Sequence, residues 1–405
     1  MSFKYFMLAL VIGAASTAQA ADNGAEELTR RLAQLEAKLR QHPEIAAYAS
    51  RAEASGHYAK GELGLPDPML YLQESQFPVG GAAGFNQEQE QKSIGLKQVI
   101  PAFGVRGAKS ERIEAESHKN KLLGDYAFAA MKAKMIEALA NLERIKQQEK
   151  LLDQQAKFFG SERASLKGRI AANQVGISQF SMSQADGTDV ELMRADLTEE
   201  KHEMMAMLTN MLGEVPEVTL PPMELESWDH DATKTYPVEI AAQDIAMASK
   251  DVDLRESEFG PNFEVQANYG RWNNGDNAGT VMVGVSIPLW LGENQKPKLA
   301  GAKAAVSAAE SDQEMIKRQT IEKLDHLKAK VDASTQRIAL LKRKESFLST
   351  SSGAQTREYE AGKADLSMPL KTRRDMLSVR YQLATEQANH TALVANFNHY
   401  IIQGE

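Results

Sequence analysis

The sequence predicts a mainly α-helical protein that carries two long helical hairpins and two β-hairpins per chain. Three observations predict this class: a duplicated order of landmarks, two very long stretches of helical composition, and short alternating stretches between them. The duplication is visible in the prolines of the first half, which recur in the same order in the second half: Pro43, Pro68 and Pro101, then Pro237, Pro261 and Pro288. A duplication explains this order better than chance.

The duplication sets the expected domain organisation. We expect a signal peptide, a first repeat, a linker and a second repeat, at residues 1–20, 21–213, 214–235 and 236–405. Each repeat should hold a β-hairpin, at about 67–101 and about 261–289, followed by a long helical hairpin, at about 104–212 and about 298–402.

The first twenty residues have the pattern of a secretory signal. Lys4 supplies a positive charge, residues 6–15 form a short apolar core, and Ala18, Gln19 and Ala20 form a small-residue cleavage site. The alternative is a membrane anchor, but this core is shorter than the roughly 20 residues that span a bilayer. We therefore expect export from the cytoplasm.

Composition narrows the class further. The chain has no cysteine, so neither a disulfide nor a lipid-accepting cysteine is expected. A formal net charge of −8 argues against a nucleic-acid partner. With 25% charged and only 6% aromatic residues, the chain suits long helices with much surface better than compact globules.

The long helices should supply most of the mass. Residues 105–172 contain no proline, and about 65 residues at 1.5 Å each would form a rod on the order of 100 Å. Residues 301–361 repeat this pattern, and 176–212 and 365–402 read as the returning helices. The returns are shorter, and predicted helices at 25–62 and 237–258 match the missing length. An ordinary soluble coiled coil is the alternative for these segments.

The alternating stretches predict strands. In the second copy, apolar residues alternate with polar or small ones on both sides of a turn: Phe263, Val265, Ala267 and Tyr269, then Val281, Val283, Val285 and Ile287. The first copy is weaker, because Glu74 and Gln98 interrupt an apolar face formed by Leu70, Leu72, Ile94, Leu96 and Ile100. Aromatic residues lie near the strand ends: Tyr71, Phe77, Trp272 and Trp290. This pattern suits an outer-membrane barrel, and a small soluble hairpin domain is the alternative.

Four strands cannot close a barrel, since small single-chain barrels need about eight. An open strand edge is not tolerated in lipid, so several chains would have to share one barrel. Two chains would give eight strands and three would give twelve.

The order and spacing of several short motifs resemble the TolC-like outer-membrane efflux family. The resemblance covers essentially the whole mature chain and rests on the His42-Pro43-Glu44 opening, residues 65–69, 98–104, 258–263, 287–290 and 359–366. It implies a homotrimer with a twelve-stranded barrel in the outer membrane, continuing into an α-helical periplasmic tunnel. It also implies a passive exit duct that works with a periplasmic adaptor protein and an inner-membrane efflux pump. Short loops resemble the metal-efflux branch in particular.

The two helix turns at the far end of the tunnel are the expected adaptor contacts. Gly362 can end one helix in a left-handed conformation, and Asp365 can cap the next helix. Asn173 falls at the matching place in the first copy, and Asn also tolerates positive φ. By resemblance, the adaptor-contacting tips are Asn173, Gln174, Val175 and Gly176 in the first copy, and Gly362, Lys363, Ala364 and Asp365 in the second. The alternative is that they are simply well-made turns.

The family narrows its channel just beyond each tip. Relatives commonly carry acidic residues where this chain has Met368 and Lys371, and the matching first-copy positions are Gln179 and Met182. The chain thus departs from the acidic ring, and the cation selectivity of such a ring does not carry over. Thioethers suit soft ions such as Cu(I), although methionine at helical spacing is more often a core filler. The eight histidines are scattered, so we expect neither a dedicated metal site nor a cofactor.

No catalytic motif is apparent, since the sequence lacks a nucleophile elbow, a phosphate-binding glycine loop and a clustered His–carboxylate set. We therefore expect a transport protein of the outer membrane with a large periplasmic part. The alternative is a periplasmic coiled-coil scaffold or adaptor-like protein without a channel. The cargo cannot be predicted, because a passive duct owes its specificity to its partners.

Overall fold

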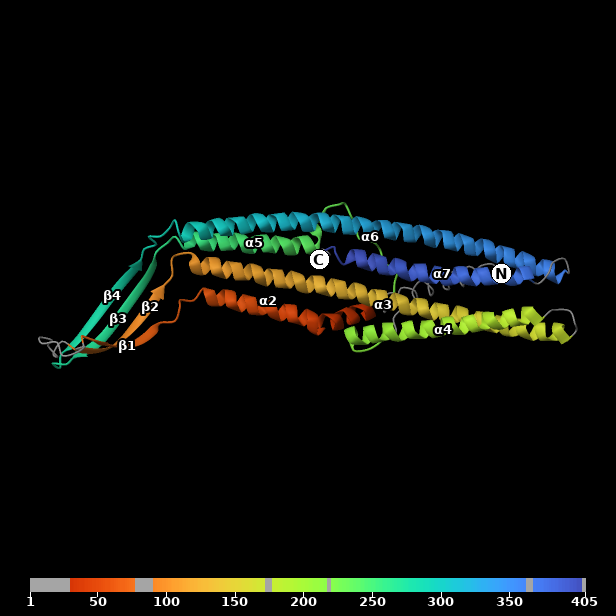
Figure 1. The fold of residues 1–405 in the computed structure, drawn as a ribbon, viewed down its shortest axis with the longest axis horizontal. Helices are drawn as coiled ribbons and strands as arrows, with labels where there is room; N and C mark the ends of the chain where they lie inside the picture. Colours follow the sequence, from red (N-terminus) through yellow and green to blue (C-terminus); the bar gives the residue numbers. More distant parts are fainter. Residues whose placement is uncertain (1–29, 77–89, 172–176, 217–219, 362–366, 403–405) are drawn as a thin grey trace, which may run out of the picture. The chain divides into compact units, whose positions relative to one another are not determined.

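The computed structural model describes residues 30–76, 90–171, 177–216, 220–361 and 367–402. The mainly helical prediction is confirmed (Figure 1). The helices are α2 (Pro43–Glu62), α3 (Val105–Ala171), α4 (Ile177–Leu212), the short η2 (Ala232–Lys234), α5 (Tyr236–Ser257), α6 (Gln295–Glu360) and α7 (Ser367–Asn398). The strands are β1 (Met69–Ser75), β2 (Gln91–Ile100), β3 (Asn262–Trp272) and β4 (Asn277–Ser286).

The predicted helix at 25–62 is interrupted in the structure. Residues 30–40 are helical, Gln41 and His42 leave the helix, and α2 then begins at Pro43. Proline is tolerated at this first position because a helix leaves its first N–H groups unpaired. The imidazole Nδ1 of His42 accepts the Glu44 amide at 3.3 Å, which helps to satisfy the new helix start.

Two of the long helices also differ at their ends from the prediction. α6 begins at Gln295, slightly earlier than expected, because Pro297 fits within the first helical turn. α7 ends at Asn398 instead of continuing to Ile402. The chain beyond it is extended enough for Ile401 to pair with Thr235.

The two predicted β-hairpins form one four-stranded antiparallel sheet in the order β1-β2-β3-β4 (Figure 1). The additional pairing joins β2 to β3 from Gln91↔Trp272 to Ile100↔Phe263. Just beyond the Ile100 end of this pair, the side-chain oxygen of Asn262 accepts a hydrogen bond from the Ala102 backbone amide at 2.9 Å. The two copies of the duplication therefore meet strand to strand.

The chain divides into two compact units, and each draws on both halves of the sequence. The sheet unit consists of Ala47–Gly124 and Tyr236–Gln319, and the helical unit consists of Met1–Ala46, Asp125–Thr235 and Thr320–Glu405. The sheet unit holds the four strands, α5, most of α2 and the first parts of α3 and α6. The helical unit holds α4, α7 and the remaining parts of α3 and α6.

In the sheet unit, polar contacts tie neighbouring helices together. The Ser117 hydroxyl of α3 donates to the Ala52 carbonyl of α2 at 2.7 Å, and both side chains are buried. Lys119 of α3 forms an ion pair of 2.5 Å with Asp244 of α5. These contacts hold α2 and α5 against α3 within the sheet unit.

In the helical unit, small apolar clusters pack between paired helices. One cluster joins α3 to α4 through Leu152, Phe159 and Leu197, each almost fully buried. Another joins α6 to α7 through Leu324 and Phe397. Figure 1 shows α4 beside α3 and α7 beside α6, so the long helices lie in neighbouring pairs.

Candidate functional site

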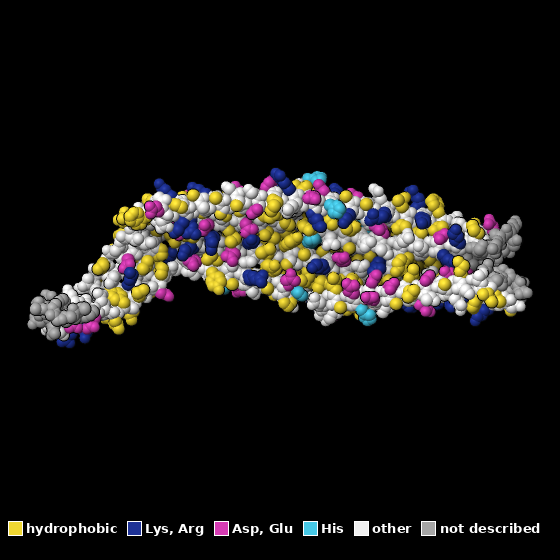
Figure 2. All heavy atoms as spheres, viewed as in Figure 1, with side chains coloured by type: hydrophobic (Ala, Val, Ile, Leu, Met, Phe, Trp, Pro, Cys, Tyr) yellow, Lys and Arg dark blue, Asp and Glu magenta, His cyan; other side chains and the backbone are white. Residues whose placement is uncertain are grey.

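The sheet has one strongly apolar face. Directly opposed residues of an antiparallel pair lie on the same face, and the register places these apolar side chains together: Leu70, Leu72, Ile94, Leu96, Ile100, Phe263, Val265, Ala267, Tyr269, Val281, Val283 and Val285. Most of them are exposed, including Leu72 at 82% and Val281 at 73%. Figure 2 shows hydrophobic side chains on the strand region. Contiguous exposed apolar surface of this kind marks a protein or membrane contact.

Polar residues border this apolar face at one end and interrupt it near the other end. Toward the 76–90 connection, Glu74 pairs with Lys92 at 3.2 Å. Toward the helices, the Gln98 amide donates to the Pro66 carbonyl at 2.8 Å, so this interrupting residue is satisfied locally. The stretch from Ile94 to Ile100, which includes Gln98, extends for about 20 Å along β2. Because the strands of an outer-membrane barrel are tilted by about 35–45°, this stretch would cover about 15 Å of an apolar band that is typically about 25 Å tall.

The opposite face of the sheet is polar and closely packed. Lys97 of β2 pairs with Glu264 of β3 at 2.7 Å. The Gln266 amide donates to the Tyr71 hydroxyl, and the Tyr71 ring lies over Gly95 of β2. From the sequence, Tyr71 is only an aromatic residue near a strand end, and this contact is not predicted. A glycine inside a strand was the available signal, since it often marks a close approach.

The two outer strands of the sheet are β1 and β4. Among the described residues, each pairs with a single neighbouring strand. Each outer edge therefore presents a row of backbone N–H and C=O groups toward whatever lies next to it. A sheet with an exposed apolar face and two open edges is incomplete as a unit, because both features need a partner surface.

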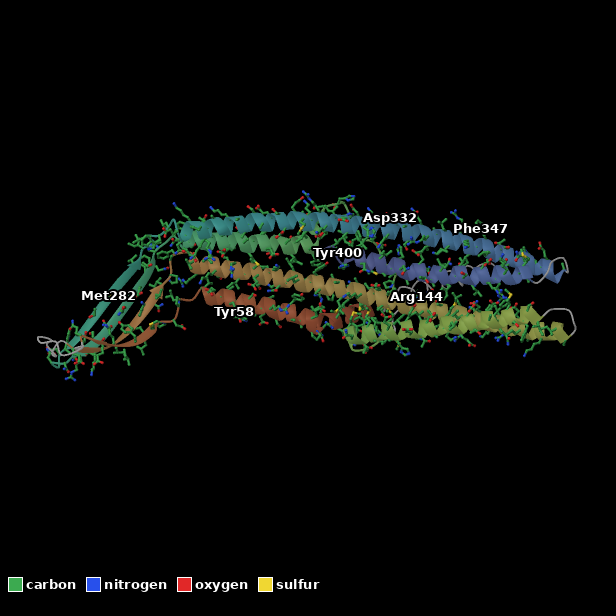
Figure 3. All side chains as sticks on the ribbon, viewed as in Figure 1. Tyr58, Arg144, Met282, Asp332, Phe347 and Tyr400 are labelled. Atoms are coloured by element: carbon green, nitrogen blue, oxygen red, sulfur yellow. The ribbon has the colours of Figure 1, made fainter. Side chains whose placement is uncertain are left out.

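Polar side chains of α3 bind it to α4 of the same hairpin and to α7 of the other hairpin within the helical unit. Arg144 of α3, labelled in Figure 3, forms an ion pair with Glu200 of α4. The fully buried Gln148 of α3 donates to the Tyr381 carbonyl and to the Thr385 hydroxyl of α7, at 3.2 and 2.8 Å. A buried amide bonded in this way fixes the axial position of α7 on α3.

A charged cluster lies closer to the ends of the same helices. Arg374 of α7 pairs with Asp186 of α4 at 2.7 Å and approaches Glu162 of α3 at 3.8 Å. Burial raises the pKa of the Glu162 carboxyl, while the neighbouring Arg374 charge opposes this rise. The guanidinium of Arg374 also lies 5.4 Å from the Phe159 ring centroid. The sequence gave no signal for this cluster, because its members are far apart along the chain.

The predicted tip residues, 173–176 and 362–365, lie outside the described residues. Of the predicted constriction residues, Met182 and Met368 are 70% and 55% exposed. Lys371 is exposed as well, whereas Gln179 lies on α4 without a described side chain. In the single chain the three described side chains are therefore available to face a channel or a neighbouring copy.

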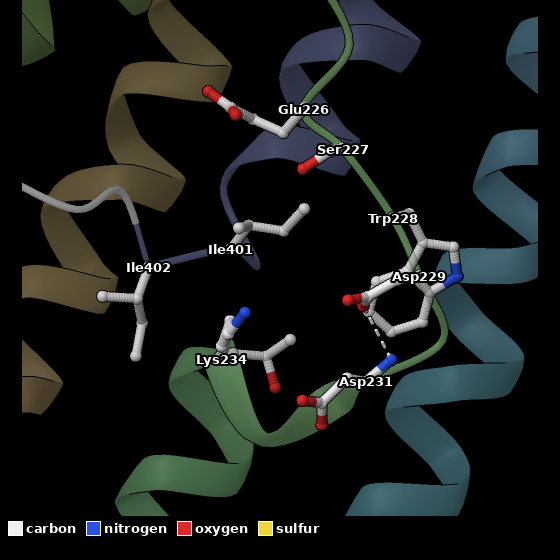
Figure 4. A pocket seen from close by; sticks show the side chains of 9 residues that line it. Glu226, Ser227, Trp228, Asp229, Asp231, Lys234, Ile401 and Ile402 are labelled. Atoms are coloured by element: carbon white, nitrogen blue, oxygen red, sulfur yellow. Dashed lines mark hydrogen bonds between the residues drawn. The ribbon is translucent and has the colours of Figure 1, made fainter.

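A hollow of about 470 Å³ lies between the linker and the end of the chain (Figure 4). Asp229 accepts the Asp231 amide at 3.1 Å, and Asp231 in turn caps η2 by accepting the Thr233 amide at 3.0 Å. The Ile402 amide donates to the Lys234 carbonyl at 3.0 Å. These bonds shape the junction that holds the linker against the segment after α7.

Two features are absent from the described residues. No described helix is long and apolar enough to cross a membrane. Within the same part of the chain, no group of three or more His, Cys, Asp or Glu side chains could hold a metal ion.

Comparisons with known proteins agree with this architecture. Residues 238–396, from α5 to α7, match the model of the family described as outer membrane efflux protein. No curated protein matches the chain in sequence.

Solved structures with the same fold include several outer-membrane proteins. The outer membrane protein VceC from Vibrio cholerae matches with a TM-score of 0.74 at 16% identity, covering 92% of this chain and 97% of that one. A membrane protein from Pseudomonas aeruginosa gives 0.78 at 12% identity, covering 92% and 91%. The MtrE outer membrane channel from Neisseria gonorrhoeae gives 0.74 at 14% identity, covering 91% and 88%. These structures show that the chain has the fold of outer-membrane channel proteins, and the family match over the second half agrees with this fold.

Proposed function

We propose that this protein is the outer-membrane exit duct of a tripartite efflux system, and that three copies share one twelve-stranded barrel. The observation that carries the proposal is the four-stranded sheet, whose apolar face is exposed and whose outer strands β1 and β4 each lack a second partner among the described residues. In lipid every backbone polar group must be paired, which only a closed barrel allows for strands. Three four-stranded sheets give twelve strands, an even number within the range of outer-membrane barrels.

In this arrangement the two faces of the sheet contact different environments. The face with Leu72 and Val281 contacts lipid, and the face with Lys97 and Glu264 lines the water-filled lumen. The helical hairpins continue the lumen as a periplasmic tunnel. The fold of the channel structures and the partial family match support this transport role, in which the protein conducts cargo passively and performs no catalysis.

The sequence supplies the remaining parts of the proposal. Residues 173–176 and 362–365 would contact the periplasmic adaptor, which connects the duct to an inner-membrane pump. Met182, Met368 and Lys371, together with Gln179, would form the narrow neck. Short loops and methionines suggested metal efflux from the sequence, but the methionines of this neck suit an apolar constriction equally well, so no particular cargo is assigned.

Reconstitution into planar lipid bilayers tests the proposal. The purified protein should form long-lived ion-conducting units, and fractionated cells should hold it with the outer-membrane barrels. If the protein is instead a periplasmic scaffold, it should be released by osmotic shock and should not conduct ions. Finding both results with folded protein would support the scaffold role.

A further inference from the structure

The polar face of the sheet contains an aromatic ring that is held flat across three strands. Tyr71 projects from β1, its ring passes over Gly95 of β2, and its hydroxyl accepts a hydrogen bond from the Gln266 amide of β3. Gly95 is buried under this ring although it belongs to a single-layered sheet. The ring therefore lies along the sheet surface and does not stand away from it.

The Tyr71 ring leaves no room for a side chain on Gly95, which explains why this position is a glycine. A Cβ added there would lie 2.7 Å from Tyr71 Cε1 and still closer to the rest of the ring end. Real Cβ atoms essentially never approach other atoms so closely, so any larger residue must displace the ring. Aromatic side chains covering strand glycines in this way are a known means of stabilising sheets.

A second glycine on the same face is covered similarly. A Cβ on Gly270 of β3 would lie 2.7 Å from the Ser93 Cβ and 2.8 Å from the side-chain Nε2 of Gln91. Gly284 of β4 differs, because a Cβ there would meet only the Glu264 Cβ at 3.6 Å, an ordinary contact. The close covering is thus specific to the region around β2.

We propose that Gly95 and Gln266 are positioning residues that hold Tyr71 flat against the inner wall of the barrel and so keep the duct wide. This inference rests on the proposed function, which makes the polar face the lumen. In a trimer, Tyr71 occurs three times at one level. Three rings released from the wall would extend toward the axis together and narrow the lumen there.

The test compares two glycine-to-alanine variants that add the same methyl group to the same face. Gly95→Ala should displace the ring, whereas Gly284→Ala is the matched control. Single-channel recordings in planar bilayers, with polyethylene glycols of increasing size on the barrel side, report the largest polymer that enters. The size limit should shift to smaller polymers in Gly95→Ala and stay unchanged in Gly284→Ala. Removing the ring in the double variant Gly95→Ala with Tyr71→Ser should restore the limit.

The outcomes separate this inference from the proposed function. A native protein that never conducts would contradict the proposed function itself. Conducting Gly95→Ala channels with the native size limit would overturn the positioning role alone. If Gly95→Ala does not assemble, Gln266→Met provides a second test, since it removes the hydrogen bond and leaves Gly95 intact. The size limit should then also shift downward, and an unchanged limit would overturn the inference.

Discussion

Two adjacent residues of β4 allow a direct test of which face of the sheet contacts lipid. Val283 lies on the apolar face opposite Val265, and Met282, labelled in Figure 3, lies on the polar face opposite Gln266. In the single chain both side chains are similarly exposed, at 66% and 56%. A soluble sheet would therefore tolerate an arginine at either position to a similar degree.

A membrane barrel would distinguish the two positions clearly. Val283 is near the middle of the apolar face, where arginine costs about 2–4 kcal/mol per chain. At about 1.4 kcal/mol per tenfold, this lowers the folding equilibrium by roughly 30-fold to 1,000-fold. The cost recurs three times per trimer, or about 6–12 kcal/mol if the sites are independent. Met282→Arg would instead place its charge in the aqueous lumen, and surface substitutions there should cost about 0.5 kcal/mol or less.

The assay is reversible urea unfolding of each variant in phospholipid vesicles, together with the yield of trimer in outer-membrane fractions. Val283→Arg should lower both quantities strongly, whereas Met282→Arg should resemble the native protein. Equal effects of the two substitutions would refute the assignment of the faces. A larger effect at Met282 would reverse it.

Three further predictions concern the helical unit. Phe397→Ala should lower the free energy of unfolding by about 3–5 kcal/mol in denaturant titrations, because the side chain is fully buried; a loss below 1 kcal/mol would contradict this packing. Burial lowers the pKa of His399 to about 4, while an unfolded histidine titrates near pH 6.5, so the folded state resists protonation. Stability should therefore be constant above about pH 7 and fall by up to about 3 kcal/mol between pH 6.5 and 4, and His399→Gln should remove this part of the pH dependence. Arg374→Gln should cost about 1–3 kcal/mol by leaving the partly buried Asp186 without its ion pair. The exposed ion pair between Arg194 and Asp153 is the control, and Arg194→Gln should lower the free energy of unfolding by less than about 1 kcal/mol.

The sequence predicted the helices and strands well where a repeating pattern was long. Strict alternation from Phe263 to Tyr269 placed β3 correctly, because one face of the strand is apolar throughout. The break at Gln41 and His42 was missed, since one proline inside a helical composition does not reveal whether the helix bends, stops or restarts. The end of α7 at Asn398 was also missed, because the pairing of Ile401 with Thr235 joins segments far apart in the chain.

The candidate site was only partly predictable for the same reason. The apolar positions of the sheet follow from alternation, but the pairing of β2 with β3 depends on contacts between the two repeats. The covering of Gly95 by Tyr71 and the cluster around Arg374 likewise need the three-dimensional register. The neck and the tips remain predictions, since the neck depends on neighbouring copies and the tips lie outside the described residues.

Native mass spectrometry of the detergent-solubilised protein measures whether three chains close one barrel. A single dominant species with the mass of three mature chains is expected, and it should dissociate only when the sheet unfolds. A stable monomer would contradict the account, since one chain supplies four strands with two open edges. A stable dimer would contradict the twelve-stranded barrel in favour of an eight-stranded one.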